Sequence, residues 1–350
     1  MERQKILVVR NDKLGDFMLA WPTFALIKRY WPEIHITAMV PEYTAPVARL
    51  CPWINEILID HNEGIWALSK NIRNGRFDAL LTLFSTGRVA LAALFAGIPY
   101  RLAPSTKIAQ LFYSHRLVQR RSHSKKPEYL YNLELAHQLL KDFSKIEPDE
   151  SLTISDNDLM PAEIKRPLLS FDDDITELRK KFIDLNNLSK KSKLIFIHPG
   201  SGGSANNLSI EQFSALAMEL SKRSSQEITF VITAGPGEEE PAQDLVAKIA
   251  ANYPAIYFQS DSGIAGFAHA LQIADLFISG STGTLHIAGA MNCNTAGFYP
   301  RHRSAIPLRW QTLNSPERRL AFTPPDGAVE NNLSTVDIDS AAISIIERFL

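Results

Sequence analysis

The sequence has only two cysteines among its 350 residues, and it lacks an apolar run long enough to cross a membrane. Cys51 and Cys293 lie far apart, which argues against a disulfide framework or a cysteine metal site and favours a reducing compartment. The longest apolar run, residues 89–98, has about half of the roughly 20 residues that a span needs. Charged residues follow the first short apolar run directly, unlike in a signal peptide. We therefore expect a cytoplasmic protein.

The sequence also lacks an excess of charge of either sign, because 37 Lys and Arg stand against 38 Asp and Glu. No global positive field therefore favours nucleic acid as a partner. The G-x-G-x-x-G fingerprint of dinucleotide-binding dehydrogenases does not follow the first predicted strand. What is present is an ordinary globular composition, 45% hydrophobic and 21% charged, with enough length for two domains.

Short apolar runs alternate with amphipathic segments of helix length, which predicts parallel α/β layers. The pattern breaks over the acidic and proline-containing stretch 144–192, interpreted as a linker and domain entry, and then restarts. We therefore predict two doubly wound Rossmann-like domains, residues 1–165 and 166–350, facing each other across a cleft. The last helix could pack back on the first domain. The main predicted elements are strands at 5–9, 35–40, 56–59, 78–84, 193–198, 227–235 and 274–280, and helices at 17–30, 88–97, 129–143 and 209–223.

The first candidate site follows the first predicted strand, in the stretch RNDKLGDFMLAWP, residues 10–22. Gly15 permits a tight turn with a positive backbone dihedral, and Asp16 then stands at the start of a helix. Doubly wound folds bind ligands at the carboxyl ends of their strands, so Arg10 and Lys13 would meet an anionic substrate there. Asp16 could then serve as a general base, or it could be a structural N-cap.

Three polar turns in the second half predict a second site. Residues 198–209, HPGSGGSANNLS, carry glycines whose backbone N–H groups can point at an anion. In AGPGEEE, residues 234–240, glutamates could accept hydrogen bonds from a ribose or an adenine, or could simply stabilise a helix dipole. In GSTGTLHIAGA, residues 280–290, Thr282 and His286 share one helix face, where a neutral histidine could bind a ligand or be structural.

Together with residues 97–101, GIPYR, these segments resemble the heptosyltransferases of lipopolysaccharide core synthesis, glycosyltransferase family 9. The matching segments occur in the family's order over roughly the first 300 residues. The resemblance implies the GT-B fold and an inverting transfer that needs neither a metal nor a cofactor. The donor would be an ADP-sugar, typically ADP-heptose, and the acceptor a lipid-linked lipopolysaccharide core oligosaccharide.

The resemblance also implies roles for single residues. Asp16 matches the family's catalytic base, and Glu238 or Glu239 falls where the family places an acidic residue near the adenosine. Asn206 and Ser281 depart from the pattern, because many members have lysine and aspartate there, so the identity of the donor sugar stays open. The predicted donor-binding residues are Ser201, Gly202, Gly203, Ser204, Asn206, Glu238, Glu239, Ser281, Thr282, Gly283 and His286, and the predicted acceptor-binding residues are Arg10, Lys13, Arg120 and Arg121.

Residues 101–126 contain seven Lys and Arg and no acidic residue. This segment is either a solvated basic face or a surface that meets the phosphorylated acceptor or the anionic cytoplasmic face of the inner membrane. Two rival functions remain open. One is a GT-B transferase or epimerase that uses another nucleotide sugar, and the other is a non-catalytic protein that binds a nucleotide sugar.

Overall fold

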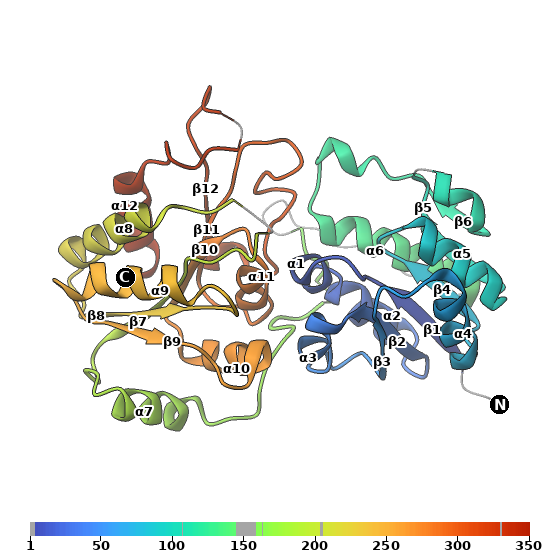
Figure 1. Cartoon of the computed structure of the whole chain (residues 1–350), viewed down its shortest axis with the longest axis horizontal. Coiled ribbons are helices and arrows are strands. Elements are labelled where there is room, and N and C mark those ends of the chain that lie inside the picture. Colours follow the sequence, from blue (N-terminus) through green and yellow to red (C-terminus); the bar gives the residue numbers. More distant parts are fainter. Residues whose placement is uncertain (1–3, 107, 145–158, 163, 204–205, 330) are drawn as a thin grey trace. The chain divides into compact units, whose positions relative to one another are not determined.

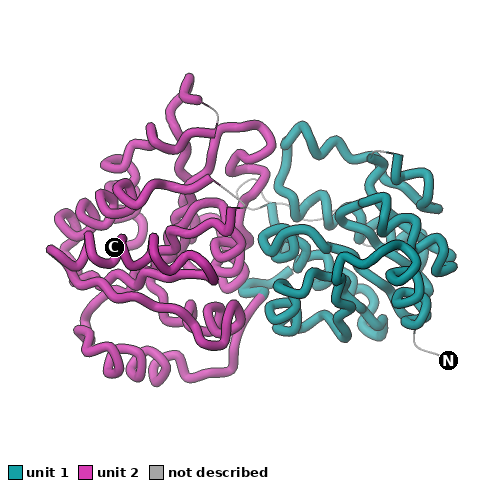
Figure 2. The backbone as a smooth tube through the Cα atoms, in the orientation of Figure 1, with its two compact units in different colours: residues 1–168 teal, residues 169–350 magenta. Residues whose placement is uncertain are grey.

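A computed structural model describes residues 4–106, 108–144, 159–162, 164–203, 206–329 and 331–350. The chain divides into two compact units, residues 1–168 and 169–350, which Figure 2 shows in two colours. Each unit has its own parallel sheet with helices packed on both faces (Figure 1). In the described part of the chain, no helix combines the length and the apolar character that a membrane span requires.

The sheet of the first unit has the strand order β3-β2-β1-β4-β5-β6, and all its described pairs are parallel. The chain reverses its direction of winding between β1 and β4, which makes their carboxyl ends a topological switch point, the usual ligand position in such sheets. The strands are β1 Lys5–Val9, β2 His35–Pro41, β3 Glu56–Asp60, β4 Ala79–Thr82, β5 Tyr100–Pro104 and β6 His115–Leu117.

The α-helices described in the first unit are α1 Leu14–Met18, α2 Trp21–Tyr30, α3 Ala45–Ala48, α4 Ile65–Gly75, α5 Gly87–Ala96 and α6 Glu128–Leu139. The prediction of one helix over 17–30 was wrong, because the helical structure is interrupted between α1 and α2. Pro22 lies in the first turn of α2, where a residue without an N–H is tolerated, and it would disrupt a helix interior. The positive dihedral expected at Gly15 was also wrong, since Gly15 is helical.

The sheet of the second unit repeats the same winding, with the order β12-β11-β10-β7-β8-β9 and parallel pairing throughout. Its switch point lies between β7 and β10. The prediction of two doubly wound α/β domains is thereby confirmed. The strands are β7 Lys193–His198, β8 Ile228–Thr233, β9 Ala255–Phe258, β10 Leu276–Gly280, β11 Thr295–Phe298 and β12 Arg319–Phe322.

The α-helices described in the second unit are α7 Ile175–Leu185, α8 Ile210–Arg223, α9 Glu239–Ala250, α10 Gly263–Ala270, α11 Gly283–Ala290 and α12 Ile338–Phe349. Helix α8 begins with a capping box, in which Ser209 and Gln212 each accept a hydrogen bond from the other's backbone N–H. The interpretation of 144–192 as linker missed α7. Asp174 caps this helix by accepting from two backbone N–H groups of its first turn. Residues 145–158 of that stretch lie outside the described residues.

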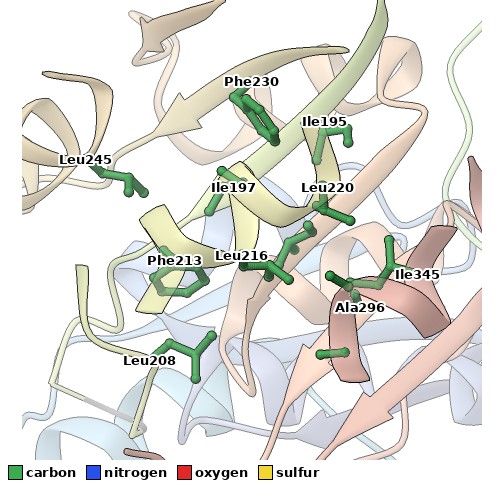
Figure 3. Packing of buried hydrophobic residues seen from close by; sticks show 14 of the residues in the cluster. Ile195, Ile197, Leu208, Phe213, Leu216, Leu220, Phe230, Leu245, Ala296 and Ile345 are labelled. Atoms are coloured by element: carbon green, nitrogen blue, oxygen red, sulfur yellow. The ribbon is translucent and has the colours of Figure 1, made fainter. Parts of the chain in front are cut away.

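The core of the second unit forms where α8 covers the sheet (Figure 3). Phe213, Leu216 and Leu220 of α8 are fully buried in one cluster with residues of β7 and β8. Each such side chain contributes about 1.5–3 kcal/mol to folding. The last helix, which the sequence allowed to pack on the first unit, contacts α8 and buries Ile345 in this same cluster.

Candidate active site

The first candidate site is organised around the guanidinium of Arg10, the residue that follows β1. Arg10 is 2% exposed and bonds to Asp12 through Nε at 2.9 Å and to Glu128 through Nη1 at 3.0 Å. Its Nη2 is paired with Asp16. Nη1 also donates to Asn132 on α6, at 3.3 Å. Burial lowers the pKa of Arg10, but the three carboxylates outweigh this effect and raise the pKa above its usual range.

The guanidinium of Arg121, which lies outside the sheet, joins the same network. Arg121 donates to Glu128 Oε1 at 2.6 Å and to the carbonyl of Leu83, just past β4, at 3.1 Å. Glu128 is therefore held between Arg10 and Arg121. This network ties the ends of β1 and β4 to α6, which places Asp16 at the switch point of the first sheet.

Asp16 lies in the first turn of α1 and not at its N-cap, which is Lys13. The helix has no side-chain cap, so the alternative that Asp16 is the N-cap was wrong. Its carboxylate is 13% exposed and ion-paired with Arg10, so it can contact a substrate while its position is fixed. A carboxylate whose position is fixed in this way can accept a proton from a hydroxyl within its reach.

The predicted acceptor residues separate into two groups. Lys13 and Arg120 are exposed to solvent. Arg10 is ion-paired with three carboxylates, and Arg121 is ion-paired with Glu128. The predicted direct contact of Arg10 with an anionic acceptor is therefore not supported, because its donors bind and orient the protein's own carboxylates.

Three predicted donor-binding turns follow β7, β8 and β10, which are neighbours in the second sheet. The structure thus brings them together at one edge. The turns after β7 and β10 flank the switch point. Asn207, in the turn after β7, donates to the carbonyls of Pro199 and Gly200, and its Oδ1 approaches Gly280 at the end of β10.

Glu238 places its carboxylate inside the glycine loop that follows β7. It accepts from the N–H of Gly202 at 2.6 Å and from that of Gly235 at 3.0 Å, and His198 Nε2 lies 3.3 Å away. The hydrogen bond with His198 contributes most to lowering the pKa of Glu238 to about 2, and the backbone N–H groups add to it against the effect of burial. The carboxylate predicted to face an adenosine is thus engaged with its own protein.

The other residues of these turns have separate environments. Gly202 and Gly203 are exposed, with φ of 53° and 67°, a conformation that favours glycine. Asn206 donates to the carbonyl of Asn331 at 2.7 Å. Glu239 accepts from Gln259 at 3.1 Å. Ser201 is partly exposed next to Gly202, and Ser204 lies outside the described residues.

The turn at 280–290 opens α11 as predicted. Thr282 is the N-cap, but its hydroxyl bonds to Ser279 at 3.0 Å and to Thr284 at 2.8 Å instead of capping. Gly283 begins the helix, and Ser281 donates its N–H to Phe298. His286 is 2% exposed, and its Nδ1 has no hydrogen-bond partner in the described structure.

His286 is therefore a neutral imidazole at physiological pH. Burial lowers its pKa to about 4. The sequence predicted a neutral histidine at this position, and the structure gives desolvation as the cause of its neutrality. A neutral imidazole can donate one hydrogen bond at the start of α11 without carrying charge of its own.

Four residues of these networks were missed from the sequence: Asp12, Glu128, Asn132 and His198. Glu128 and Asn132 are four apart on α6, so they share one helix face, and both are buried. A carboxylate and an amide on the buried face of a helix are a recognisable signal of an internal ion pair. Within the described residues, no group of three or more His, Cys, Asp or Glu could hold a metal ion.

The chain is similar to several known proteins. A Haemophilus influenzae protein named "Putative glycosyltransferase" is 42% identical over 349 residues, covering 98% of this chain and 96% of that protein. The lipopolysaccharide core heptosyltransferase OpsX of the same species is 23% identical over 325 residues, covering 89% and 82%. The solved structure of Escherichia coli ADP-heptose lipopolysaccharide heptosyltransferase II has a TM-score of 0.72 at 17% identity, covering 99% and 97%.

The likeness to the solved structure shows the fold, so the protein is a two-domain α/β protein of the GT-B class. Residues 65–317 match the model of glycosyltransferase family 9 (heptosyltransferase). The chain belongs to glycosyltransferase family 9, and it is a glycosyltransferase of the kind that acts in lipopolysaccharide core synthesis.

Proposed function

We propose that this protein transfers a heptose from ADP-heptose to the lipopolysaccharide inner core, with lipid A-Kdo as acceptor, by an inverting and metal-independent reaction. The observation that carries the proposal is the Asp16 carboxylate, oriented by the buried Arg10 at the switch point of the first sheet. Membership of the heptosyltransferase family and the names of its relatives support the choice of sugar and acceptor.

In this mechanism Asp16 accepts the proton of the acceptor hydroxyl. The electron pair of the broken O–H bond forms the new bond to the anomeric carbon, and the bond from that carbon to ADP breaks. The transition state resembles an oxocarbenium ion, as in glycoside hydrolysis. Negative charge grows on the departing ADP. The N–H groups at the start of α11, which has no side-chain cap, and the neutral His286 stabilise this charge.

A different donor sugar is the second candidate, and two positions favour it. Asn206 donates its amide to Asn331, and Ser281 offers a hydroxyl, where many members have a lysine and an aspartate. These changes remove one charge of each sign from the donor side. In this alternative the protein is a GT-B transferase or epimerase with another nucleotide sugar, or it binds a nucleotide sugar without catalysis.

The test is a transfer assay with ADP-heptose and a heptose-deficient core acceptor in the presence of EDTA, followed by mass spectrometry of the acceptor. We expect a gain of one heptose, and we expect Asp16→Ala to lower kcat by roughly a thousandfold or more while ADP still binds. Asp60→Asn, which removes another carboxylate of the same unit, is the control. Equal activity of Asp16→Ala and the intact protein would contradict the proposed base.

A screen of other ADP- and UDP-sugars in the same assay separates the alternatives. Tight ADP binding with transfer only from a different sugar would replace heptose in the proposal. Tight binding of a nucleotide sugar without transfer or epimerisation would favour the non-catalytic alternative. We also propose that the protein works at the cytoplasmic face of the inner membrane, where its lipid-linked acceptor would be located.

A further inference from the structure

One loop carries the positive charge at the carboxyl edge of the second sheet. We define the β11 loop as residues 299–315, which leave β11 and lead to the turn before β12. Its sequence contains Arg301, Arg303 and Arg309 and no Asp or Glu. The sequences of the other connections at this edge contain no Lys or Arg, and some contain acids. These connections are residues 199–209, 234–238, 259–262, 281–282 and 323–337.

The β11 loop begins beside the turn that opens α11. Strands β10 and β11 pair in parallel, with Gly280 opposite Phe298, and Ser281 donates its N–H to the carbonyl of Phe298 at 3.1 Å. Neighbouring strands lie about 5 Å apart, so the chain enters the β11 loop one strand away from the start of α11. The proposed function places the diphosphate of the donor at that helix start. The positive charge of the β11 loop is therefore located next to the proposed diphosphate site.

Hydrogen bonds and packing fix the course of the β11 loop. Trp310 donates its Nε1–H to the carbonyl of Ser304 at 2.7 Å, and the buried Tyr299 donates its hydroxyl to the carbonyl of Trp310 at 3.4 Å. Thr312 packs closely on α11, because a Cβ added at Gly289 would lie 2.7 Å from the Cβ of Thr312. The loop is thus held against α11, and the positions of its arginines are tied to that helix.

The three arginines of the β11 loop differ in their access to a ligand. Arg309 is 9% exposed, so we assign it to the interior of the loop. Arg303 is exposed to solvent. Arg301 is partly exposed, donates to the carbonyl of Pro324 at 3.1 Å and is paired with Asp326, whose side chain is 93% exposed. An ion pair with so exposed a partner contributes little, so an anion with several charges can replace Asp326.

We propose that Arg301 and Arg303 bind the diphosphate of the donor. A guanidinium offers paired N–H donors that fit phosphate oxygens, and it stays charged at any physiological pH. In this arrangement Arg301 exchanges Asp326 for a phosphate oxygen. Both arginines then stabilise the charge that grows on ADP as its bond to the sugar breaks. This inference rests on the proposed function, in which the donor is an ADP-sugar.

Calorimetric titration with ADP and with adenosine separates binding of the diphosphate from binding of the nucleoside. We expect Arg301→Gln and Arg303→Gln each to weaken ADP binding by about tenfold, and the double variant by about a hundredfold, because charge-assisted hydrogen bonds are lost. Adenosine has no phosphate and should bind equally to all these proteins. Lysine at both positions should recover part of the ADP affinity, because it restores the charge but not the paired donors.

The matched control is Arg318→Gln. Arg318 belongs to the same connection but lies directly before β12, at the opposite edge of the sheet, where it is exposed and donates to the carbonyl of Asn292 at 3.2 Å. This variant should bind ADP as the intact protein does. Asp326→Asn tests the exchange of partners. It should bind ADP about threefold more tightly, because no carboxylate then competes for Arg301.

The salt dependence of ADP binding provides a test on the intact protein. Its affinity for ADP should fall as salt is added, and this dependence should be much weaker in the double variant. Equal ADP affinity of the double variant and the intact protein would overturn the proposal. An equal loss for adenosine and ADP, or an equal loss in Arg318→Gln, would also overturn it, because the β11 loop would then act through the fold or through general charge.

The outcome can be distinguished from that of the transfer assay. Failure of transfer with every donor, together with ADP binding that depends on the two arginines, would remove the proposed function and leave this inference standing. Transfer from ADP-heptose with the same KM for the donor in the double variant would overturn this inference alone. An intact protein that binds no ADP would overturn both.

Discussion

Glu238 accepts hydrogen bonds from backbone N–H groups of the kind that could otherwise bind an external anion. Its carboxylate receives backbone N–H groups from two different turns, and a Cβ at Gly200 would lie 2.1 Å from it. Gly200 therefore makes room for an internal acid. The sequence could not reveal this arrangement, because Gly202 and Glu238 lie 36 positions apart and a glutamate at a helix start has several ordinary roles.

Replacing Glu238 by Gln should loosen the glycine loop. Charge-assisted hydrogen bonds to two N–H groups weaken, so we expect a loss of about 1–2 kcal/mol in the free energy of unfolding and weaker binding of ADP. The pKa of this acid is lowered from 4.5 to about 2, so its contribution is complete above pH 4.5 and is lost as the pH falls through about 2. Urea unfolding at several pH values and calorimetry with ADP measure both effects.

The matched control for this prediction is Glu239→Gln. Glu239 also begins α9, but the side chain that bonds to it is Gln259, and it is not a partner of the glycine loop. A similar loss in both variants would mean that any acid in this turn stabilises α9, and that Glu238 has no particular part in shaping the loop.

At the scale of single elements, the sequence predicted what local chemistry controls. The buried strands at 5–9 and 193–198 and the helix after Ser209 agree with the structure, because periodicity and capping are local signals. The break before Pro22, the helix at 175–185 and the strand at 319–322 were missed. β12 is only partly buried and short, so its stability comes from pairing with β11 and not from an apolar pattern of its own.

The start of α8 gives a quantitative test at this scale. Ser209→Ala removes the side-chain half of the capping box and should lower the free energy of unfolding by about 1 kcal/mol. Ser214→Ala, inside the same helix, is the control and should be neutral or slightly stabilising, because alanine is the better helix former. Chemical denaturation of both variants measures their free energies of unfolding. Equal stability of the two variants would mean that packing alone fixes where α8 begins.

The net charge of the whole molecule is only −1. Attraction to an anionic surface therefore depends on where its positive charges are located. Part of the basic segment 101–126 is used internally: Arg101 donates to backbone carbonyls, Arg121 pairs with Glu128, and Lys126 pairs with Glu134. The remaining described cations, Arg116, Arg120 and Lys125, are exposed. Apolar side chains of the same segment are exposed as well, namely Ile108 at 77%, Leu111 at 68% and Val118 at 77%.

Combined replacement of Arg116, Arg120 and Lys125 by Gln should therefore weaken binding to anionic lipid vesicles by roughly a hundredfold, at about 1 kcal/mol for each charge. Binding of the intact protein should also fall as salt is added. The control replaces Lys180, Lys190 and Lys191, three exposed lysines of the second unit. Vesicle flotation measures both. Unchanged binding of the first variant would make this segment a solvated basic face.

The two sheets wind in the same order, and each holds its own polar turns at its own switch point. Deprotonation of the acceptor is assigned wholly to the first unit, whereas both departures from the family pattern, Asn206 and Ser281, lie in the second. The two roles are assigned to different halves of the chain, so substitutions can change the donor sugar without altering the base and its counterions. A chimera that exchanges only the second half with a relative should then inherit that relative's donor and keep its own acceptor.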